Sequence, residues 1–396
     1  MRGSYGEVGN DQIGGDRFLY LPSSYGAASD SGVNKYNFGL ASNPYTSLMI
    51  VENKIGNPDL TWEKAKKMNV GVDINLFNNC LTASFDIFKE KRNNILANRS
   101  TSPMIIGANL PAYNFGEMEN RGWEMDLNFR HHIQDFHYWA RFNYSFARNE
   151  IIYMDEVQKR YDYQMTTGRR KNQFFGLIFD GYYNSWEEIN ALDRPKSSWS
   201  GNQLQPGDVK YIDVNQDGVI DDYDMVPIGY TPVPEIIYGF SFGAQYKGFD
   251  FSILFQGADN VSIKYFGRSM WPFAKGEESA KSLIKERWTQ ERYEAGEKIT
   301  FPRLSLNPNG ETDHNYRPST LWIRDASYLR LKNLEVGYTF TGGFVKRLNL
   351  NSVRLYFNGS NLFTWTDVVD LDPEAPSRSG NVEINTYPLQ KVYNIG

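Results

Sequence analysis

The sequence predicts an all-β fold, a transmembrane antiparallel β-barrel whose strands are joined by long extracellular loops. Three observations predict it. Apolar and polar residues alternate strictly in several stretches, two-residue turns keep the apolar residues of paired arms on one face, and short turns alternate with very long polar segments. No stretch has the ~18 consecutive apolar residues of a membrane helix, so any membrane span is made of strands.

The clearest hairpin is Tyr238–Phe255. Both of its arms place aromatic or aliphatic side chains at every second position, and only Lys247-Gly248 separates them. Across a two-residue loop the flanking residues pair directly, so Tyr246 and Phe249 share the apolar face. The turn and the alternation therefore predict the same register.

Three further pairs of arms show the same alternation, two of them across two-residue loops and the last across a longer turn. They are Val70–Leu76 with Leu81–Ile87 across Asn78-Asn79, Trp123–Ile133 with Phe136–Phe146 across Gln134-Asp135, and Leu334–Phe340 with Val353–Phe357. Aromatic residues near the short turns are expected to form the girdle at the inner membrane interface: Phe77, Phe136, Tyr138, Tyr246, Phe249, Tyr338 and Phe340. The alternative is a soluble β-sandwich or β-helical enzyme, in which the aromatic face is an internal core. The gathering of the long loops at one end favours the barrel.

Along the chain, strands are predicted on both sides of each short turn. In order they are Met1–Gly9, Lys64–Phe77, Cys80–Ile95, the hairpin Glu119–Ile152, the hairpin Tyr238–Phe255, Ile323–Phe340, Val353–Phe363 and a last strand reaching Ile395. The long extracellular loops run over about residues 10–63, 96–118, 153–234, 257–322 and 364–388. One helix is predicted inside the fourth loop, over Ala280–Tyr293 with Ser279 as its N-cap.

Composition excludes several function classes. The net charge is −5, from 42 basic and 47 acidic residues, and no basic block suggests a nucleic-acid groove. The single cysteine, Cys80, cannot form an internal disulfide. The four histidines fit no catalytic triad or zinc spacing, and adjacent carboxylates point apart on a strand. We therefore expect no catalytic residues and no enzyme.

The acidic segment Asp213–Asp224 resembles a calcium loop. Oxygen ligands recur at the required spacing and Gly218 allows the sharp turn between them. The expected ligands of a structural Ca²⁺ are Asp213, Asn215, Asp217, the carbonyl of Val219, Asp221 and Asp224. The alternative is a surface loop rich in Asx-turns that holds no metal.

Five tryptophans lie in or beside the long loops: Trp186, Trp199, Trp271, Trp322 and Trp365. Because an aromatic ring stacks on the C–H face of a sugar, these residues are candidates for substrate binding. The alternative is that they pack the small cores that long loops need.

Several stretches together resemble the SusC/RagA family of TonB-linked outer-membrane transporters. They are Asn57–Lys64 followed by Asn69–Asp73, Asn120–Glu124, Gly207–Tyr211 with the acidic loop, Ala326–Leu334, Asn358–Thr364 and Tyr387–Gln390. The matches run in order over essentially the whole chain.

The resemblance implies a 22-stranded barrel closed by an N-terminal plug. It also implies import of oligosaccharides or peptides, a SusD-like surface lipoprotein, and energy from TonB–ExbB–ExbD through the plug. We expect residues 1–396 to supply about ten strands, the C-terminal part of such a barrel, in the outer membrane of a Gram-negative bacterium and in contact with its lipid. We expect a fragment of a longer exported protein, with the plug absent from this sequence. The alternative function is a secreted, calcium-stabilised β protein that binds or cleaves polysaccharide.

Overall fold

A computed structural model of the chain provides the fold. It describes residues 1–11, 18–21, 26–27, 35–40, 45–48, 50–51, 55–101, 110–199, 204–265, 267, 271–273, 282–305, 313–369, 371–374, 381–382 and 388–396.

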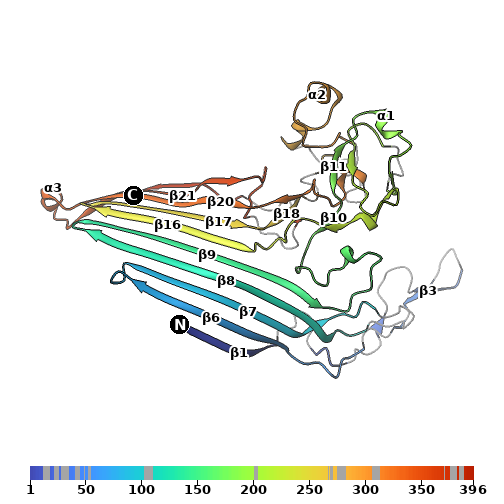
Figure 1. The fold of residues 1–396 in the computed structure, drawn as a ribbon, viewed down its shortest axis with the longest axis horizontal. Coiled ribbons are helices and arrows are strands. Elements are labelled where there is room, and N and C mark those ends of the chain that lie inside the picture. Colours follow the sequence, from blue (N-terminus) through green and yellow to red (C-terminus); the bar gives the residue numbers. More distant parts are fainter. Residues whose placement is uncertain are drawn as a thin grey trace.

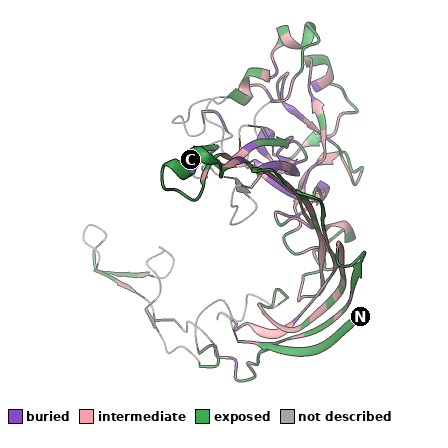
Figure 2. Ribbon diagram, turned by 90° about the vertical axis from the view of Figure 1, so that its left-hand side faces the viewer, coloured by how far each residue is buried: buried purple, intermediate pink, exposed green. Residues whose placement is uncertain are grey.

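One sheet of ten strands dominates the structure, and each strand runs antiparallel to its neighbours (Figure 1). In sheet order the strands are β1 (Arg2–Asn10), β6 (Glu63–Leu76), β7 (Leu81–Ala97), β8 (Tyr113–Ile133), β9 (Phe136–Tyr153), β16 (Ile236–Tyr246), β17 (Phe249–Asp259), β20 (Tyr328–Phe340), β21 (Val353–Thr366) and β23 (Val392–Ile395). The sheet order follows the chain order, and the sheet curves into an open arc when it is seen along the strands (Figure 2). This is the all-β antiparallel barrel wall that the sequence predicts.

The predicted registers are confirmed at the short turns. Tyr246 pairs with Phe249, Ile133 with Phe136, and Leu76 with Leu81. Lys247 and Gly248 have φ of 46° and 92°, the left-handed values that a tight hairpin turn requires. A Cβ at Gly248 would lie 2.7 Å from the carbonyl oxygen of Thr339, so the close approach of the next strand also requires glycine there.

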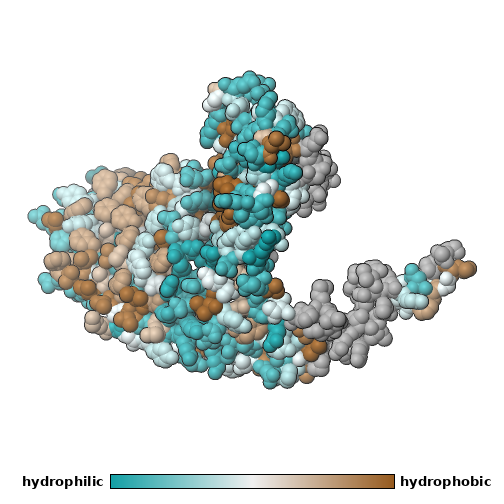
Figure 3. Space-filling model, turned by 45° about the vertical axis from the view of Figure 1, so that its right-hand side comes forward, coloured by the Kyte–Doolittle hydropathy of each residue, from teal (hydrophilic) through white to brown (hydrophobic). Residues whose placement is uncertain are grey.

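The two faces of the sheet differ in polarity. The convex face, here called the outer face, carries the apolar stripes, whose side chains remain uncovered: Val70 is 59% exposed, Ile87 56% and Phe240 41%. Figure 3 shows hydrophobic side chains gathered on this surface at the end away from the loops. The concave or inner face carries ion pairs such as Arg2 with Asp73, 2.6 Å apart. The alternative in which the stripes meet in an internal core is therefore wrong.

Six of the seven rings predicted for the aromatic girdle contact another ring of that set, and Phe77 is exposed in its turn. At the short-turn end, the ring centroids of Phe249 and Tyr338 lie 4.4 Å apart, those of Tyr338 and Phe340 4.5 Å, and those of Phe136 and Tyr246 6.1 Å. No helix in the described part of the chain is long and apolar enough to span a bilayer.

Short elements occupy the long loops. The strands are β2 (Gly26–Ala27), β3 (Lys35–Phe38), β4 (Tyr45–Leu48), β5 (Ile50–Val51), β10 (Phe175–Gly176), β11 (Phe179–Tyr182), β12 (Lys196–Ser197), β13 (Val209–Tyr211), β14 (Val219–Ile220), β15 (Val226–Pro227), β18 (Ser262–Tyr265), β19 (Ile323–Asp325) and β22 (Asn381–Val382). The helices are α1 (Trp186–Ile189), α2 (Gln290–Glu294) and α3 (Gly343–Arg347), of which α3 lies in the longer turn between β20 and β21.

Two sequence predictions of local structure are wrong. The helix predicted over Ala280–Tyr293 is a 3₁₀ segment, Ser282–Glu286, followed by α2, whose N-cap is Thr289. It breaks because Trp288 turns into the loop core and its backbone N–H donates to Phe301 instead. Ser279 lies outside the described residues. The strand predicted over Ile323–Phe340 is split into β19 and β20.

Candidate functional site

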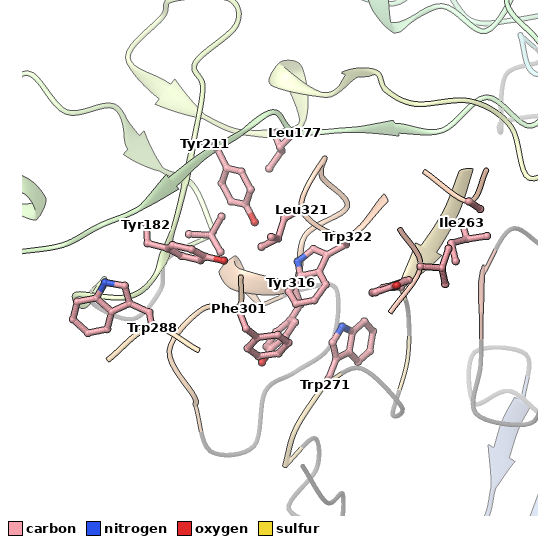
Figure 4. Packing of buried hydrophobic residues seen from close by; sticks show 14 of the residues in the cluster. Leu177, Tyr182, Tyr211, Ile263, Trp271, Trp288, Phe301, Tyr316, Leu321 and Trp322 are labelled. Carbon is pink, nitrogen blue, oxygen red and sulfur yellow. The ribbon is translucent and has the colours of Figure 1, made fainter. Parts of the chain in front are cut away.

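The long loops at one end of the sheet fold around a hydrophobic core of their own. Its buried residues come from the segments between β9 and β16, between β17 and β20, and after β21: Leu177, Tyr182, Val209, Tyr211, Ile220, Val261, Ile263, Tyr265, Trp271, Trp288, Phe301, Tyr316, Leu321, Trp322, Ala326 and Val368. We call this body the loop assembly. Figure 4 shows Trp322 beside Phe301 and Tyr316, and its ring centroid lies 5.4 and 5.3 Å from theirs.

Buried polar groups join two of these loops. Asp208 is 3% exposed, and it forms a 2.6 Å ion pair with Arg303 and accepts a hydrogen bond from Asn315. His314 Nε2 lies 2.7 Å from the carbonyl oxygen of Val209, which fixes Nε2 as the donor. Burial lowers the pKa of His314, so its imidazole is neutral at pH 7. The two loops are therefore joined by specific hydrogen bonds as well as by apolar packing.

A second polar cluster attaches the last loop to the inner face of β20. Arg330 is 2% exposed, and its guanidinium lies 2.6 Å from Asp372 and 2.8 Å from Glu374. Tyr328 donates a 2.7 Å hydrogen bond to Glu374, which also pairs with Lys332 at 3.0 Å. Burial opposes ionisation of Asp372, but Arg330 and two backbone N–H groups outweigh it and hold the pKa of this carboxyl below its ordinary value.

A polar recess of about 350 Å³ opens on the inner face where the strands meet the loops. Its charged and amide lining includes Glu90, Arg92, Asn120, Asn149, Lys171 and Glu235. Glu90, Asn120 and Asn149 are opposite one another on β7, β8 and β9, so they share the inner face. A second recess of about 240 Å³ shares Arg92 and continues toward β1.

The floor of the larger recess is held by a buried carboxylate. Glu235 is 5% exposed and accepts hydrogen bonds of 2.9 and 2.8 Å from Arg148. Arg170 binds the same carboxylate, and Asn260 donates to it at 3.1 Å. The recess therefore presents fixed donors and acceptors of both charges, which suits a ligand rich in hydroxyl or amide groups.

The five candidate tryptophans do not form one platform. Trp322 and Trp271 are 3% and 9% exposed inside the loop assembly, so their rings cannot stack on a sugar in this arrangement. The guanidinium of Arg317 lies 4.1 Å from the ring centre of Trp199. Trp365 belongs to β21 and lies on the outer face beside Phe363, which turns it away from the lumen. Trp186, at the start of α1, is 50% exposed and is the candidate within the loops whose ring is half-open to solvent.

The acidic loop forms as a network of Asx-type hydrogen bonds. Asp213 accepts from the N–H groups of Gln216 and Gly218, and Asp217 accepts from Val219. Asp224 is fully buried and accepts from three backbone N–H groups; burial raises the pKa of its carboxyl. Asn215 and Asp221 likewise accept from neighbouring N–H groups. In the described part of the chain, no three His, Cys, Asp or Glu side chains are grouped to hold a metal. Calcium binding stays a prediction.

Sequence reasoning missed the two buried ion clusters. Arg330 alternates locally with Leu329 and Leu331, but parity counted back from the stripe Leu334–Phe340 puts it on the apolar face. The bulge between Leu331 and Asn333 turns it to the inner face, and the sequence does not indicate that bulge. The partner of Arg330, Asp372, lies 42 residues away in a loop, and nothing local indicates the pairing. Glu235 is also far in the sequence from Arg148 and Arg170, and nothing local indicates that they pair.

Comparison with known proteins identifies the family. The family model described as "TonB dependent receptor-like, beta-barrel" matches residues 2–362. TonB-dependent receptor P3 of Formosa agariphila is 27% identical over 414 residues, covering 100% of this chain and 38% of that protein. TonB-dependent receptor SusC of Bacteroides thetaiotaomicron is 25% identical over 402 residues, covering 100% of this chain and 37% of SusC.

A solved structure has the same fold. The RagAB peptide importer in its open-open state aligns with a TM-score of 0.69 and 23% identity, over 99% of this chain and 39% of that one. This chain thus spans less than two fifths of the length of these relatives. As its SusC/RagA resemblance implied, the chain belongs to the β-barrel family of TonB-dependent receptors, proteins of the Gram-negative outer membrane.

Proposed function

We propose that this chain forms the C-terminal barrel portion of a TonB-dependent importer of oligosaccharides or peptides. The observation that carries the proposal is the division of the sheet into an apolar outer face and a polar inner face with a recess below folded loops. A wall of this kind separates lipid from a hydrated path. The chain's relatives are receptors, and the RagAB complex is described as a peptide importer.

The partners follow from the same resemblance. A SusD-like surface lipoprotein would cover the loop assembly, and TonB–ExbB–ExbD would act through a plug. The recess offers charges of both signs, which supports either hydroxyl-rich sugars or peptide termini as cargo. Trp186 is the ring best placed to stack on a sugar.

Uptake by whole cells tests the proposal. Cells with the complete receptor, cells lacking it and cells lacking TonB are given a starch-oligosaccharide mixture or a tryptic digest of casein, and depletion is followed by mass spectrometry. We expect one mixture to be depleted only when both the receptor and TonB are present. Equal depletion in all three strains for both mixtures contradicts import of these cargoes.

The membrane-barrel fold and the SusD-like partner are tested by two separate measurements. The receptor should require detergent for extraction and should co-purify with a lipid-modified protein whose peptides identify it as SusD-like. Extraction by salt alone would favour the secreted polysaccharide-binding alternative. In the complete receptor, Trp186→Ala should weaken uptake of a sugar cargo, and Trp365→Ala should leave it unchanged.

A further inference from the structure

A row of cations lies on the outer face directly above the apolar band. On each of four adjacent strands, the continuous apolar stripe of the outer face is followed on the loop side by Lys or Arg. The apolar residue and the cation that follows it are Met68 and Lys66 on β6, Ile87 and Lys89 on β7, Trp123 and Arg121 on β8, and Phe146 and Arg148 on β9.

The strand register makes this row continuous. Lys89 is directly opposite Arg121, and Arg121 is directly opposite Arg148. Lys66 is opposite Lys91, which shares the outer face with Lys89. Because neighbouring strands lie about 4.8 Å apart, the heads of adjacent long side chains can reach one phosphate group. Arg148 is already bound to Glu235, so the available members are Lys66, Lys89 and Arg121.

The cations are the exposed members of their ion pairs. The Lys89 side chain is 55% exposed, and that of its partner Glu119, 2.9 Å away, is 16% exposed. The Arg121 side chain is 60% exposed and lies 3.8 Å from Glu150. Lys66 is exposed and has no carboxylate partner among the described residues. Because exposed ion pairs contribute little, these charges remain available to another anion.

The other strands of the wall lack such a row. The outer-face positions of β16, β17, β20 and β21 hold no Lys or Arg in the described chain. Lys332 lies unpaired at a bulge of β20, and its ammonium binds Glu374 in the inner-face cluster. β21 instead ends its outer face with Phe363 and Trp365. Figure 3 shows hydrophilic side chains between the apolar band and the loops. The cations are therefore concentrated over β6 to β8.

We propose that Lys66, Lys89 and Arg121 bind a phosphate-bearing headgroup of an outer-leaflet lipid. The apolar band places the adjoining residues at headgroup depth on the extracellular side. Arg matches a phosphate bidentately and Lys adds a mobile point charge, whereas a neutral headgroup needs neither. The proposal depends on the orientation of the wall in the membrane and does not depend on which cargo is imported.

The experiment measures lipid retained by the purified complete receptor. The receptor is incubated with diphosphorylated lipid A or with dephosphorylated lipid A in detergent micelles, and bound lipid is counted by native mass spectrometry. The test variant combines Lys66→Gln, Lys89→Gln and Arg121→Gln. The matched control removes three cations at the short-turn end: Lys247→Gln, Lys346→Gln and Arg347→Gln.

We expect the test variant to retain about tenfold less diphosphorylated lipid A than the wild type, with the control unchanged. Dephosphorylated lipid A should bind all three proteins equally weakly. Equal retention of the diphosphorylated lipid by the test variant and the wild type overturns the proposal. So does equal retention of the two lipids by the wild type, which indicates binding through acyl chains alone.

A variant with one substitution keeps the test decisive if the triple variant does not fold. Lys66→Gln breaks no ion pair in the described structure, so its folding is not at risk. It should retain about two- to threefold less diphosphorylated lipid A than the wild type. Unchanged retention in this variant, together with a triple variant that fails to fold, also overturns the proposal.

Discussion

The barrel wall and the loop assembly use the same aromatic residues for opposite purposes. On the wall, Phe240 is 41% exposed and Phe249 60% exposed, and same-face neighbours such as Phe242 and Phe251 remain partly exposed. In the loop assembly, Tyr316 and Trp322 are 2% and 3% exposed. Residue type therefore does not decide where an aromatic ring lies; the solvent that the element faces does.

The two regions are also held together differently. The wall depends on backbone ladders between neighbouring strands and leaves its apolar face to lipid. The loop assembly has few ladders and depends on a buried core joined by ion pairs such as Asp208 with Arg303. It should therefore respond to loss of a buried ring as a small water-soluble domain does.

The largest effect should come from Trp322→Ala. Removing this buried ring, which also loses its 2.8 Å hydrogen bond to Asn315, should destabilise the loop assembly by about 3–5 kcal/mol. The wall does not contain Trp322, so its strands should stay folded. Hydrogen exchange on the detergent-solubilised receptor should show faster exchange in the loops and unchanged exchange in β16 and β17.

The half-exposed Trp186 provides the control for this prediction. Trp186→Ala should change loop stability by about 0.5 kcal/mol or less, because the ring is 50% exposed. Equal effects of the two substitutions, or faster exchange throughout the wall with Trp322→Ala, would mean that the two regions do not fold independently.

A pair of adjacent residues on β17 tests the orientation of the wall. Ile253 lies on the outer face opposite Phe242, and Ser252 lies on the inner face opposite Glu335. Ile253→Arg should reduce the stability of the membrane-inserted receptor by about 2–4 kcal/mol, since it places a charge in hydrocarbon. Ser252→Arg should have little effect beside a carboxylate in the lumen. The measurement is urea unfolding in lipid vesicles, and a larger loss from Ser252→Arg would reverse the assignment of the faces.

The sequence predicted the wall because the pairing of its strands is determined by residues that are close together in the sequence. Period-2 alternation and short turns determine which residues pair, and Tyr246 with Phe249 follows from a few neighbouring residues. The loop assembly depends on contacts between distant segments. Trp288 looks helical in its local pattern, yet it is buried against Phe301, and Trp271 and Trp322 look like surface platforms until the core is assembled. The sequence neighbourhood of Trp365 likewise predicts a loop, whereas the structure extends β21 through it and places its ring on the outer face.

Acid should loosen the last loop before the wall. The pKa of Asp372 is below its ordinary value of 3.8 in the folded protein, so its ion pair with Arg330 contributes stability above that value. This contribution is lost as the pH falls below about 4 through the folded pKa. Limited proteolysis should therefore cut the loop after β21 faster at pH 3 than at pH 7.

Asp372→Asn isolates that group. The variant should show a smaller difference between the two pH values than the wild type, because Glu374 is then the one carboxylate of this cluster left to be protonated beside Arg330. A wild-type loop that is cut equally at pH 3 and pH 7 would show that the Arg330 cluster does not hold the loop in place.

The smallest expected effect is that of calcium on the acidic loop. The carboxylates of Asp213 and Asp217 already accept backbone N–H groups, but each carboxylate oxygen keeps a second lone pair for a cation. With a dissociation constant on the order of 10⁻⁴–10⁻³ M, 1 mM Ca²⁺ should stabilise the loop assembly by about 0.4–1.4 kcal/mol. Calorimetry should detect the binding in the complete receptor, and Asp213→Asn should remove it. If 1 mM Ca²⁺ gives neither heat nor slower hydrogen exchange at Asp213–Asp224, the loop is held by its Asx-turns alone, and its local order comes from backbone hydrogen bonds and not from a metal.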